Sequence, residues 1–135
     1  MYEFKIITSL VIINEEGKFL LGKRSMDEDV FPGLWSIPGG KVEHGPRQLD
    51  VLEDNVKKEV LEEVGVKVTV DSYIQSHSDG NGKIYIIFKG RIIDGIPEPL
   101  EDTEKVEWFN MEDIKEELLC PEVYNILQKV TGNQK

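Results

Sequence analysis

The chain has 135 residues and a formal net charge of −10, so the molecule as a whole would repel a polyanion such as DNA or RNA. Apolar residues make up 39 % and charged residues 31 % of the chain, as in ordinary globular domains, and no apolar run approaches the roughly 20 residues of a membrane-spanning helix. We therefore expect one domain, residues 1–135, that binds neither a nucleic acid polymer nor a membrane.

The first 40 residues predict short strands around a polar loop. Residues 5–14 are apolar and β-branched, and residues 18–24 have the composition of a strand that returns from the turn at 14–17, so the pair reads as a β-hairpin. Residues 25–34 form a polar loop punctuated by Pro32 and Gly33. The stretch 35–40 is expected to be a short strand that runs into a glycine turn.

Residues 51–64 have the pattern of an amphipathic helix. An apolar residue recurs at every fourth position, at Leu52, Val56, Val60 and Val64, and forms a stripe along one face. Asp50 followed by Glu53 resembles a capping box. Gly65 is a suitable residue to end the helix.

The second half of the chain predicts a mixture of strands and helices. We expect strands at 66–70, 73–78, 83–93 and 105–110, a tight turn at 79–82, an acidic loop at 95–104, and short helices near 111–118 and 121–130. Together with the first half, these elements indicate an α+β fold, in which a central mixed β-sheet lies between helices in an α/β/α layered domain.

Three glutamates of the predicted helix share one arc beside its apolar stripe. At about 100° per residue, Glu59, Glu62 and Glu63 span roughly 100° of the helix surface. Crowded carboxylates raise one another's pKa, and a bound Mg²⁺ or Mn²⁺ would remove that conflict. The alternative is a solvated helix face on which Lys58 pairs with Glu62. The two glycines before the helix, Gly39 and Gly40, favour the metal site, because they let the backbone approach closely.

At these residues the sequence resembles a known family. "PGLWSIPGGKVEHG" followed by "KKEVLEEVG" is similar to the Nudix box, the signature of the Nudix hydrolases, and nearly the whole chain takes part in the resemblance. Gly40 matches the first glycine of the box. Its closing half is matched by Glu59, Val60, Glu62, Glu63, Gly65 and Val66.

The box departs from the family pattern in two ways. Lys58 replaces an arginine, which keeps the charge but loses the planar fork that can hold two carboxylates. Four extra residues, about one helical turn, also separate Gly40 from Lys58. Counted forward, the first glutamate of the box becomes Pro46, and counted back it becomes Asp50. We favour Asp50, with the insertion at 45–49, because the helix registry is then kept.

The resemblance implies a Nudix fold and a metal-dependent hydrolase of phosphoric anhydride bonds. The expected reaction is pyrophosphohydrolysis of a nucleoside triphosphate to a monophosphate and pyrophosphate, with water attacking phosphorus and Mg²⁺ or Mn²⁺ as cofactor, as in the small MutT-like members. Two alternatives stay open. One is a pyrophosphatase of ADP-ribose or sugar nucleotides, and the other is a non-catalytic module that binds a nucleotide. The resemblance also leaves a homodimer open, and Cys120, as the only cysteine, favours the cytoplasm.

The resemblance also assigns roles to individual residues. The expected metal ligands are Gly40, Glu59, Glu62, Glu63 and Glu104, with Asp102 and Glu101 as substitutes for Glu104. Glu62 is either a ligand or the general base, and Lys58 stands in the catalytic segment. Contacts to phosphate are expected from Arg24, Lys41 and Gly39, with a solvated surface cation as the alternative for Arg24 and Lys41. Glu43 is expected to help order the loop. His44 and His77 have no partner at metal-ligand spacing.

Overall fold

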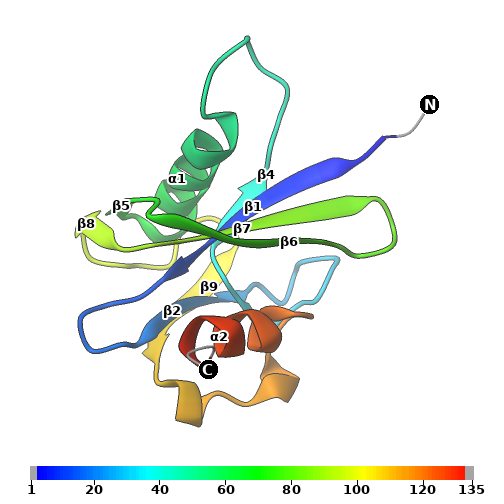
Figure 1. Ribbon diagram of the computed structural model, residues 1–135. Coiled ribbons are helices and arrows are strands. Elements are labelled where there is room, and N and C mark those ends of the chain that lie inside the picture. The colour runs from blue at the N-terminus through cyan, green and yellow to red at the C-terminus, as the bar shows by residue number, and fades with distance from the viewer. Residues whose placement is uncertain (1–2, 133–135) are drawn as a thin grey trace.

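The computed structural model describes residues 3–132 of the chain (Figure 1). The strands are β1 (Lys5–Ile12), β2 (Phe19–Arg24), β3 (Trp35–Ser36), β4 (Gly39–Lys41), β5 (Lys67–Val68), β6 (Ser72–Ser78), β7 (Lys83–Gly90), β8 (Ile92–Asp94) and β9 (Thr103–Phe109). The helices are α1 (Val51–Val64) and α2 (Val123–Gly132), and two 3₁₀ turns, Met111–Asp113 and Glu116–Leu118, precede α2. No helix within 3–132 is long and apolar enough to cross a membrane.

The strands form three small sheets. A four-stranded sheet has the order β4-β1-β7-β6, and it is mixed because β1 and β7 are parallel while the other pairs are antiparallel. A three-stranded antiparallel sheet has the order β3-β2-β9, and β5 pairs with β8. The predicted hairpin of residues 5–14 and 18–24 is therefore wrong. Only Ile13 and Phe19 form a bridge, and beyond it the two strands diverge into different sheets.

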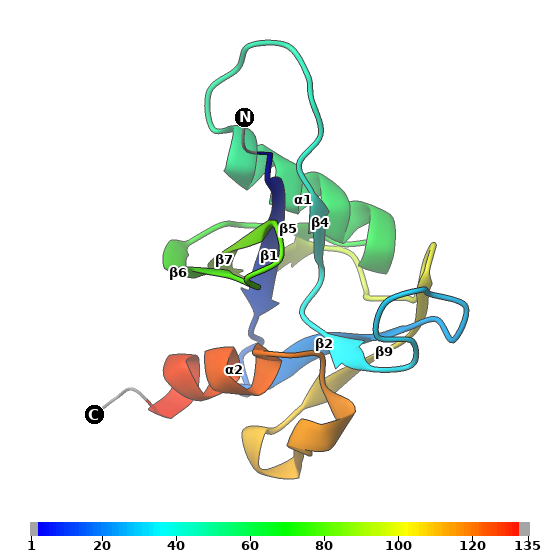
Figure 2. The same ribbon diagram turned by 90° about the vertical axis from the view of Figure 1, so that its right-hand side faces the viewer.

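The two helices cover opposite sides of the strands, as Figure 2 shows. The core is accordingly divided into two clusters. Val56, Val60 and Val64 of α1 pack with one cluster, which includes Leu10 and Ile12 of β1. Ile126 and Leu127 of α2 pack with the other, which includes Val11 of β1. Because successive side chains of β1 point to opposite faces, this strand contributes to both clusters. The predicted α+β class with a mixed sheet between helices is confirmed.

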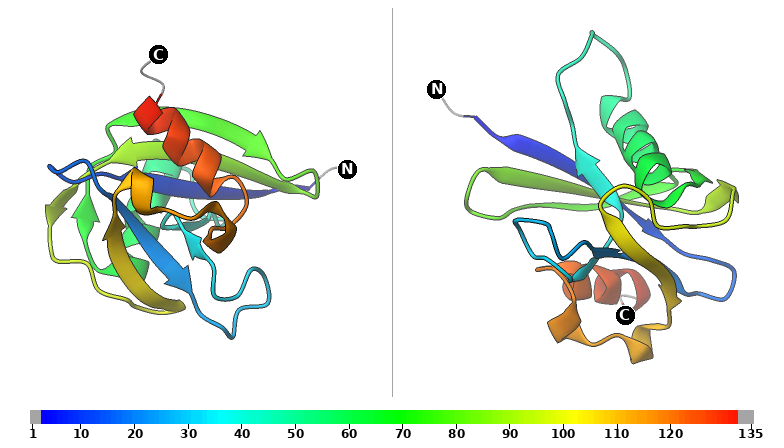
Figure 3. Two further views of the ribbon diagram at one scale, coloured as in Figure 1. Left: turned by 90° about the horizontal axis from the view of Figure 1, so that it is seen from below. Right: turned by 180° about the vertical axis from the view of Figure 1, so that it is seen from behind.

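Helix α1 begins and ends where the sequence predicted. Gly65 takes the left-handed conformation (φ 74°) and its N–H donates to the carbonyl of Leu61, which is the expected way to end a helix. The predicted capping box is wrong, since Asp50 makes no side-chain cap hydrogen bond. Asp50 is itself left-handed (φ 55°), whereas a side-chain cap requires an extended backbone at that position. The loop 42–50, which contains the proposed insertion, projects from the body of the molecule (Figure 3).

Two other predicted elements are interrupted. The strand expected at 83–93 breaks after Gly90, where a side chain would overlap the carbonyl of Thr69. The helix expected near 111–118 is replaced by the two 3₁₀ turns, because Ile114 and Lys115 between them are extended. This extended backbone allows Ile114 and Leu119 to turn into the core, where both are buried.

Candidate active site

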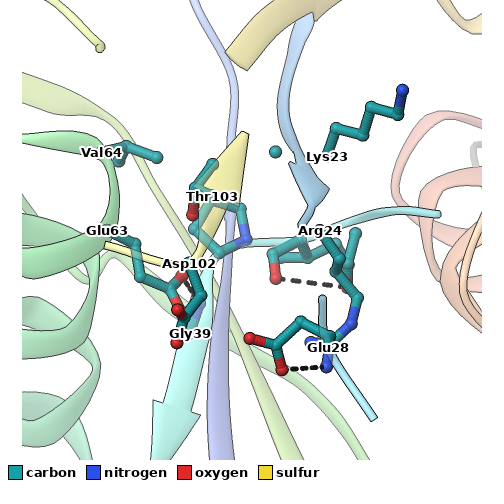
Figure 4. Close-up of a pocket in the computed structure, with 12 residues that line it drawn as sticks. Lys23, Arg24, Glu28, Gly39, Glu63, Val64, Asp102 and Thr103 are labelled. Atoms are coloured by element: carbon teal, nitrogen blue, oxygen red, sulfur yellow. Dashed lines mark hydrogen bonds and ion pairs between the residues drawn. The ribbon is translucent and has the colours of Figure 1, made fainter. Parts of the chain in front are cut away.

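A cleft of about 130 Å³ lies where the C-terminal end of α1 meets β4, β2 and the start of β9. Its wall includes Arg24, Glu28, Gly39, Glu63 and Asp102. In Figure 4 the side chains of Glu63 and Asp102 lie beside Gly39, and Arg24 and Glu28 face them from the other side. The cleft therefore combines several carboxylates with one guanidinium.

Glu63 is the most strongly perturbed group in the cleft. The pKa of its carboxyl is raised from 4.5 to about 7, mainly by burial and also by the neighbouring charges of Glu59 and Glu101, while a hydrogen bond from Gly39 and the charge of Arg24 oppose the shift. In that hydrogen bond the N–H of Gly39 donates to Oε1 of Glu63 over 3.1 Å. A buried carboxylate among other carboxylates is a setting that a cation would stabilise.

Glu59 lies directly against the second glycine of the pair. A Cβ atom on Gly40 would overlap the end of the Glu59 side chain, which is 16 % exposed. Neither Gly39 nor Gly40 has a positive φ, and both lie in β4. The expected glycine turn is thus a strand, and the glycines serve close approach.

The carbonyl group of Gly40 already has partners. Gly40 pairs with Thr8 across β4 and β1, and its oxygen accepts a hydrogen bond of 3.2 Å from Nδ2 of Asn55. The same Nδ2 donates to Oγ1 of Thr8 over 2.9 Å. Since polar groups of successive strand residues point in opposite directions, the N–H and C=O of Gly39 face away from β1, toward Glu63.

Lys58 contacts two of the three box glutamates. Its Nζ lies 3.1 Å from Oε2 of Glu59 and 3.7 Å from Oε2 of Glu62. The hydrogen bond and charge of Glu59 raise the pKa of Lys58, and Glu62 contributes further. The pair between Lys58 and Glu62 that a solvated helix would show is therefore present, but the same lysine also holds Glu59 at the edge of the cleft.

The acidic loop before β9 is fixed to the end of α1. The N–H groups of Glu98 and Leu100 donate to the carbonyls of Val64 and Glu63, over 3.0 and 2.9 Å. This attachment brings the charge of Glu101 close to Glu63 and places Asp102 in the wall of the cleft. Glu104, which the sequence ranked first, is not in that wall and lies 3.9 Å from Nζ of Lys23.

Only one of the two cationic residues expected to contact phosphate lies in the wall of the cleft. Arg24 is in the wall of the cleft, where Nε donates to the carbonyl of Val30 and Nη2 to Oε1 of Glu28, both over 2.9 Å. Lys41 is exposed and outside the wall, as are Glu43 and Asp50 in the projecting loop. Sequence reasoning missed Glu28, because its position in a polar loop gave no sign that it pairs with Arg24.

The donor atoms around the cleft fit a hard divalent cation. The candidate ligands are carboxylate and main-chain oxygens, the type that Mg²⁺ and Mn²⁺ prefer, and Glu63 is buried with a raised pKa. Within residues 3–132, no three carboxylate, imidazole or thiol groups are already gathered as a finished metal site. Glu63 of α1 and Asp102, just before β9, line the cleft, whereas Glu59 of α1 lies against Gly40, outside the wall. The three side chains thus match the cation in chemistry and need rotation to converge on it.

Comparison with known proteins identifies the family. The model of the NUDIX domain matches residues 4–130. The nucleoside triphosphatase NudI of Klebsiella pneumoniae (strain 342) is 30 % identical over 138 residues, which cover 92 % of each chain. A MutT protein from Methanosarcina mazei Go1 has the same fold, with a TM-score of 0.81, 23 % identity and coverage of 99 % of this chain and 97 % of that one. A NUDIX hydrolase from Nitrosomonas europaea has a TM-score of 0.85 at 20 % identity and covers 99 % of this chain and 73 % of that one. With the acidic cleft at the end of α1, these matches show that the chain belongs to the Nudix family and is a hydrolase of phosphoric anhydride bonds.

Proposed function

We propose that the chain hydrolyses nucleoside triphosphates to nucleoside monophosphates and pyrophosphate, with Mg²⁺ or Mn²⁺ as cofactor. The relative NudI, which covers 92 % of the chain, is a nucleoside triphosphatase. The observation that carries the proposal is the placement of the buried Glu63 carboxylate between the N–H of Gly39 and the cleft that also contains Arg24 and Asp102. Such a site can hold a cation and a phosphate chain side by side.

We assign the metal ligands on geometry. Glu59 and Glu63 approach the glycine strand from α1, and Asp102 with Glu101 supplies the charge from the loop before β9. The main-chain ligand that fits is the carbonyl of Gly39, because that of Gly40 faces β1 and Asn55. A divalent cation bound there neutralises anhydride oxygens and lowers the pKa of a bound water.

The remaining residues bind, orient and accept protons. Arg24 uses two of its five N–H donors on Val30 and Glu28, which leaves three for phosphate oxygens. Glu62 is half-exposed on the same arc as Glu59, and we propose it as the acceptor of the proton from the attacking water, or else as a further ligand. Lys58 orients the carboxylates of Glu59 and Glu62 by contacting both.

A hydrolysis screen tests the function. Purified protein would be incubated with Mg²⁺ and nucleoside triphosphates, ADP-ribose and sugar nucleotides, with Glu59→Gln as the inactive control. We expect release of monophosphate and pyrophosphate from triphosphates, reduced at least 100-fold in the control. Release of diphosphate and orthophosphate, or preferential cleavage of ADP-ribose, would contradict the proposal.

We also propose that the enzyme works in the cytoplasm. Its single thiol, Cys120, is free, as expected where cysteines stay reduced. A homodimer stays a prediction, which sedimentation of the purified protein would test.

A further inference from the structure

Asn55 connects the helix that carries the box glutamates to the glycine strand. Its Nδ2 donates two hydrogen bonds, one of 3.2 Å to the carbonyl of Gly40 and one of 2.9 Å to Oγ1 of Thr8. Thr8 is fully buried, and it lies opposite Gly40 where β1 pairs with β4. One side chain of α1 thus holds both members of a cross-strand pair, and the reaction proposed above gives it no role.

The fold alone does not require polar residues at these two positions. Asn55 lies in the interior of α1, where asparagine is a poorer helix former than alanine or leucine. Thr8 is on the same face of β1 as Leu10 and Ile12, which pack in the apolar cluster under α1. When both partners of a buried hydrogen bond are replaced by apolar groups, stability often changes little. Residues that go against local preference in this way are typical of functional positions.

Asn55 is the first of three polar residues that form a row along α1 and meet the glycine strand. Asn55, Glu59 and Glu63 recur at every fourth position, so the row is about 12 Å long, and β4 lies against this side of the helix (Figure 2). Asn55 binds the carbonyl of Gly40, and Glu59 fills the space in front of the same residue. Glu63 accepts the N–H of Gly39. The row therefore fixes the glycine segment at both of its ends.

The first member of the row is neutral, and the other two are acidic. The charge of Glu59 raises the pKa of Glu63, so the way in which these two side chains hold the strand depends on protonation and on a bound cation. The amide of Asn55 is a donor at every pH and needs no cation. It therefore holds the glycine strand in place before a metal binds, and a site that is already ordered loses less entropy on binding.

We propose that Asn55 is a positioning residue for the metal site. It holds Gly40 against β1, so that the carbonyl of Gly39 and the two carboxylates of the row can converge on one cation. Because its amide binds the carbonyl of Gly40, it also leaves that of Gly39 as the main-chain ligand. The inference rests on the metal site proposed above, and it adds a residue that touches neither metal nor substrate. Loss of such a supporting residue typically lowers metal affinity 10- to 100-fold.

Binding of Mn²⁺ at pH 8 tests the proposal, with the free ion measured by electron paramagnetic resonance and Tm measured in EDTA on the same samples. Asn55→Ala removes both hydrogen bonds and should bind Mn²⁺ at least tenfold more weakly than the wild type. Thr8→Val removes only the bond to Thr8. It should bind within threefold of the wild type, although its Tm should fall by a few degrees because one N–H of Asn55 loses its partner. Asn110→Ala, whose amide makes its hydrogen bond outside α1 and β4, is the matched control and should bind like the wild type.

Asn55→Asp separates positioning from simple electrostatics. The carboxylate keeps the shape and can accept the hydroxyl of Thr8, but it has no N–H for the carbonyl of Gly40. Added negative charge alone would tighten Mn²⁺ binding, whereas loss of the donor should weaken it at least tenfold.

The inference is overturned if either Asn55 variant binds Mn²⁺ as tightly as the wild type, or if Thr8→Val loses as much affinity as Asn55→Ala. A wild type that binds no Mn²⁺ overturns both this inference and the proposed cofactor. Failure of the proposed function alone is read separately, as absence of hydrolysis of nucleoside triphosphates by a wild type that still binds Mn²⁺.

Discussion

The side chain of Glu59 lies so close to Gly40 that a Cβ atom at position 40 would overlap its carboxylate. The atoms in the way are the end of a flexible side chain, which can rotate aside at small cost to the fold. We therefore expect Gly40→Ala to lower the affinity for Mg²⁺ or Mn²⁺ by roughly 10- to 100-fold, as when a ligand loses its support, with little change in Tm. Calorimetric titration of metal and a melting curve on the same sample would check both.

The adjacent glycine is the control for this prediction. A Cβ atom on Gly39 would overlap the backbone carbonyl of Thr8, and a strand backbone cannot rotate aside. Gly39→Ala should therefore destabilise the fold by roughly 1–3 kcal/mol, seen as a clear fall in Tm. If Gly40→Ala lowered Tm as much as Gly39→Ala, the prediction that the Glu59 side chain can rotate away from position 40 would be contradicted.

The raised pKa of Glu63 predicts a pH dependence of the metal-free protein. The folded pKa of about 7 lies above the ordinary value of 4.5, so the native state holds a proton that the unfolded chain releases. The contribution of this group to stability is present in full below about pH 4.5 and is lost as the pH rises through 7, with an upper limit of about 3 kcal/mol. Urea unfolding between pH 5 and 8, in EDTA, would measure it.

Glu63→Gln supplies the comparison. Glutamine keeps an oxygen that can accept the N–H of Gly39 but carries no charge, so the variant should be more stable than the wild type at pH 8 and similar to it at pH 5. The variant should also bind Mg²⁺ weakly at both pH values. A wild type whose stability does not fall from pH 5 to 7 relative to Glu63→Gln would contradict the shift.

The resemblance to the Nudix box predicts that Lys58 takes the place of an arginine, and the structure shows Lys58 in contact with Glu59 and Glu62. Because its side chain is more than half exposed, Lys58→Met should leave Tm nearly unchanged. Without this cation the two glutamates lose their common partner, and we expect kcat to fall about tenfold. Lys58→Arg, which can hold both carboxylates with its fork, should keep activity within a few-fold. Equal activity in Lys58→Met would exclude a role in orienting the glutamates.

The parts of the fold that the sequence predicted well are those set by local physics. The four-residue spacing of Leu52 and the valines predicted the course of α1, and the glycine at position 65 predicted its C-terminal end, because an amphipathic helix and its C-terminal cap depend on neighbours in the chain. The hairpin failed because β1 pairs with β4 and β7, which come later in the sequence. Strand composition at 18–24 identifies a strand but not its partner.

The same distinction between local and long-range interactions applies to the candidate site. The carboxylates of α1 and the close approach of the glycines could be predicted, since helix geometry places Glu59 and Glu63 on one side. Which acidic residue near the start of β9 reaches the cleft could not be predicted, because this depends on contacts between distant parts of the chain. Glu98 and Leu100 are hydrogen-bonded to Val64 and Glu63 at the end of α1, and this attachment places Asp102, and not Glu104, in the wall of the cleft.

The sequence and the structure favour different acidic residues of this segment as the metal ligand, and this difference can be tested. Asp102 lines the cleft, whereas Glu104 lies 3.9 Å from Lys23. We expect Asp102→Asn to lower kcat/KM by 10- to 100-fold and to weaken Mg²⁺ binding, because it removes a charge that faces Glu63. Glu104→Gln should change kcat/KM by less than threefold, since its exposed ion pair contributes little. Steady-state kinetics over a range of Mg²⁺ concentrations would measure both variants. If Glu104→Gln is the more damaging of the two, the loop must rearrange when the metal binds, and the order given by the sequence would be the right one.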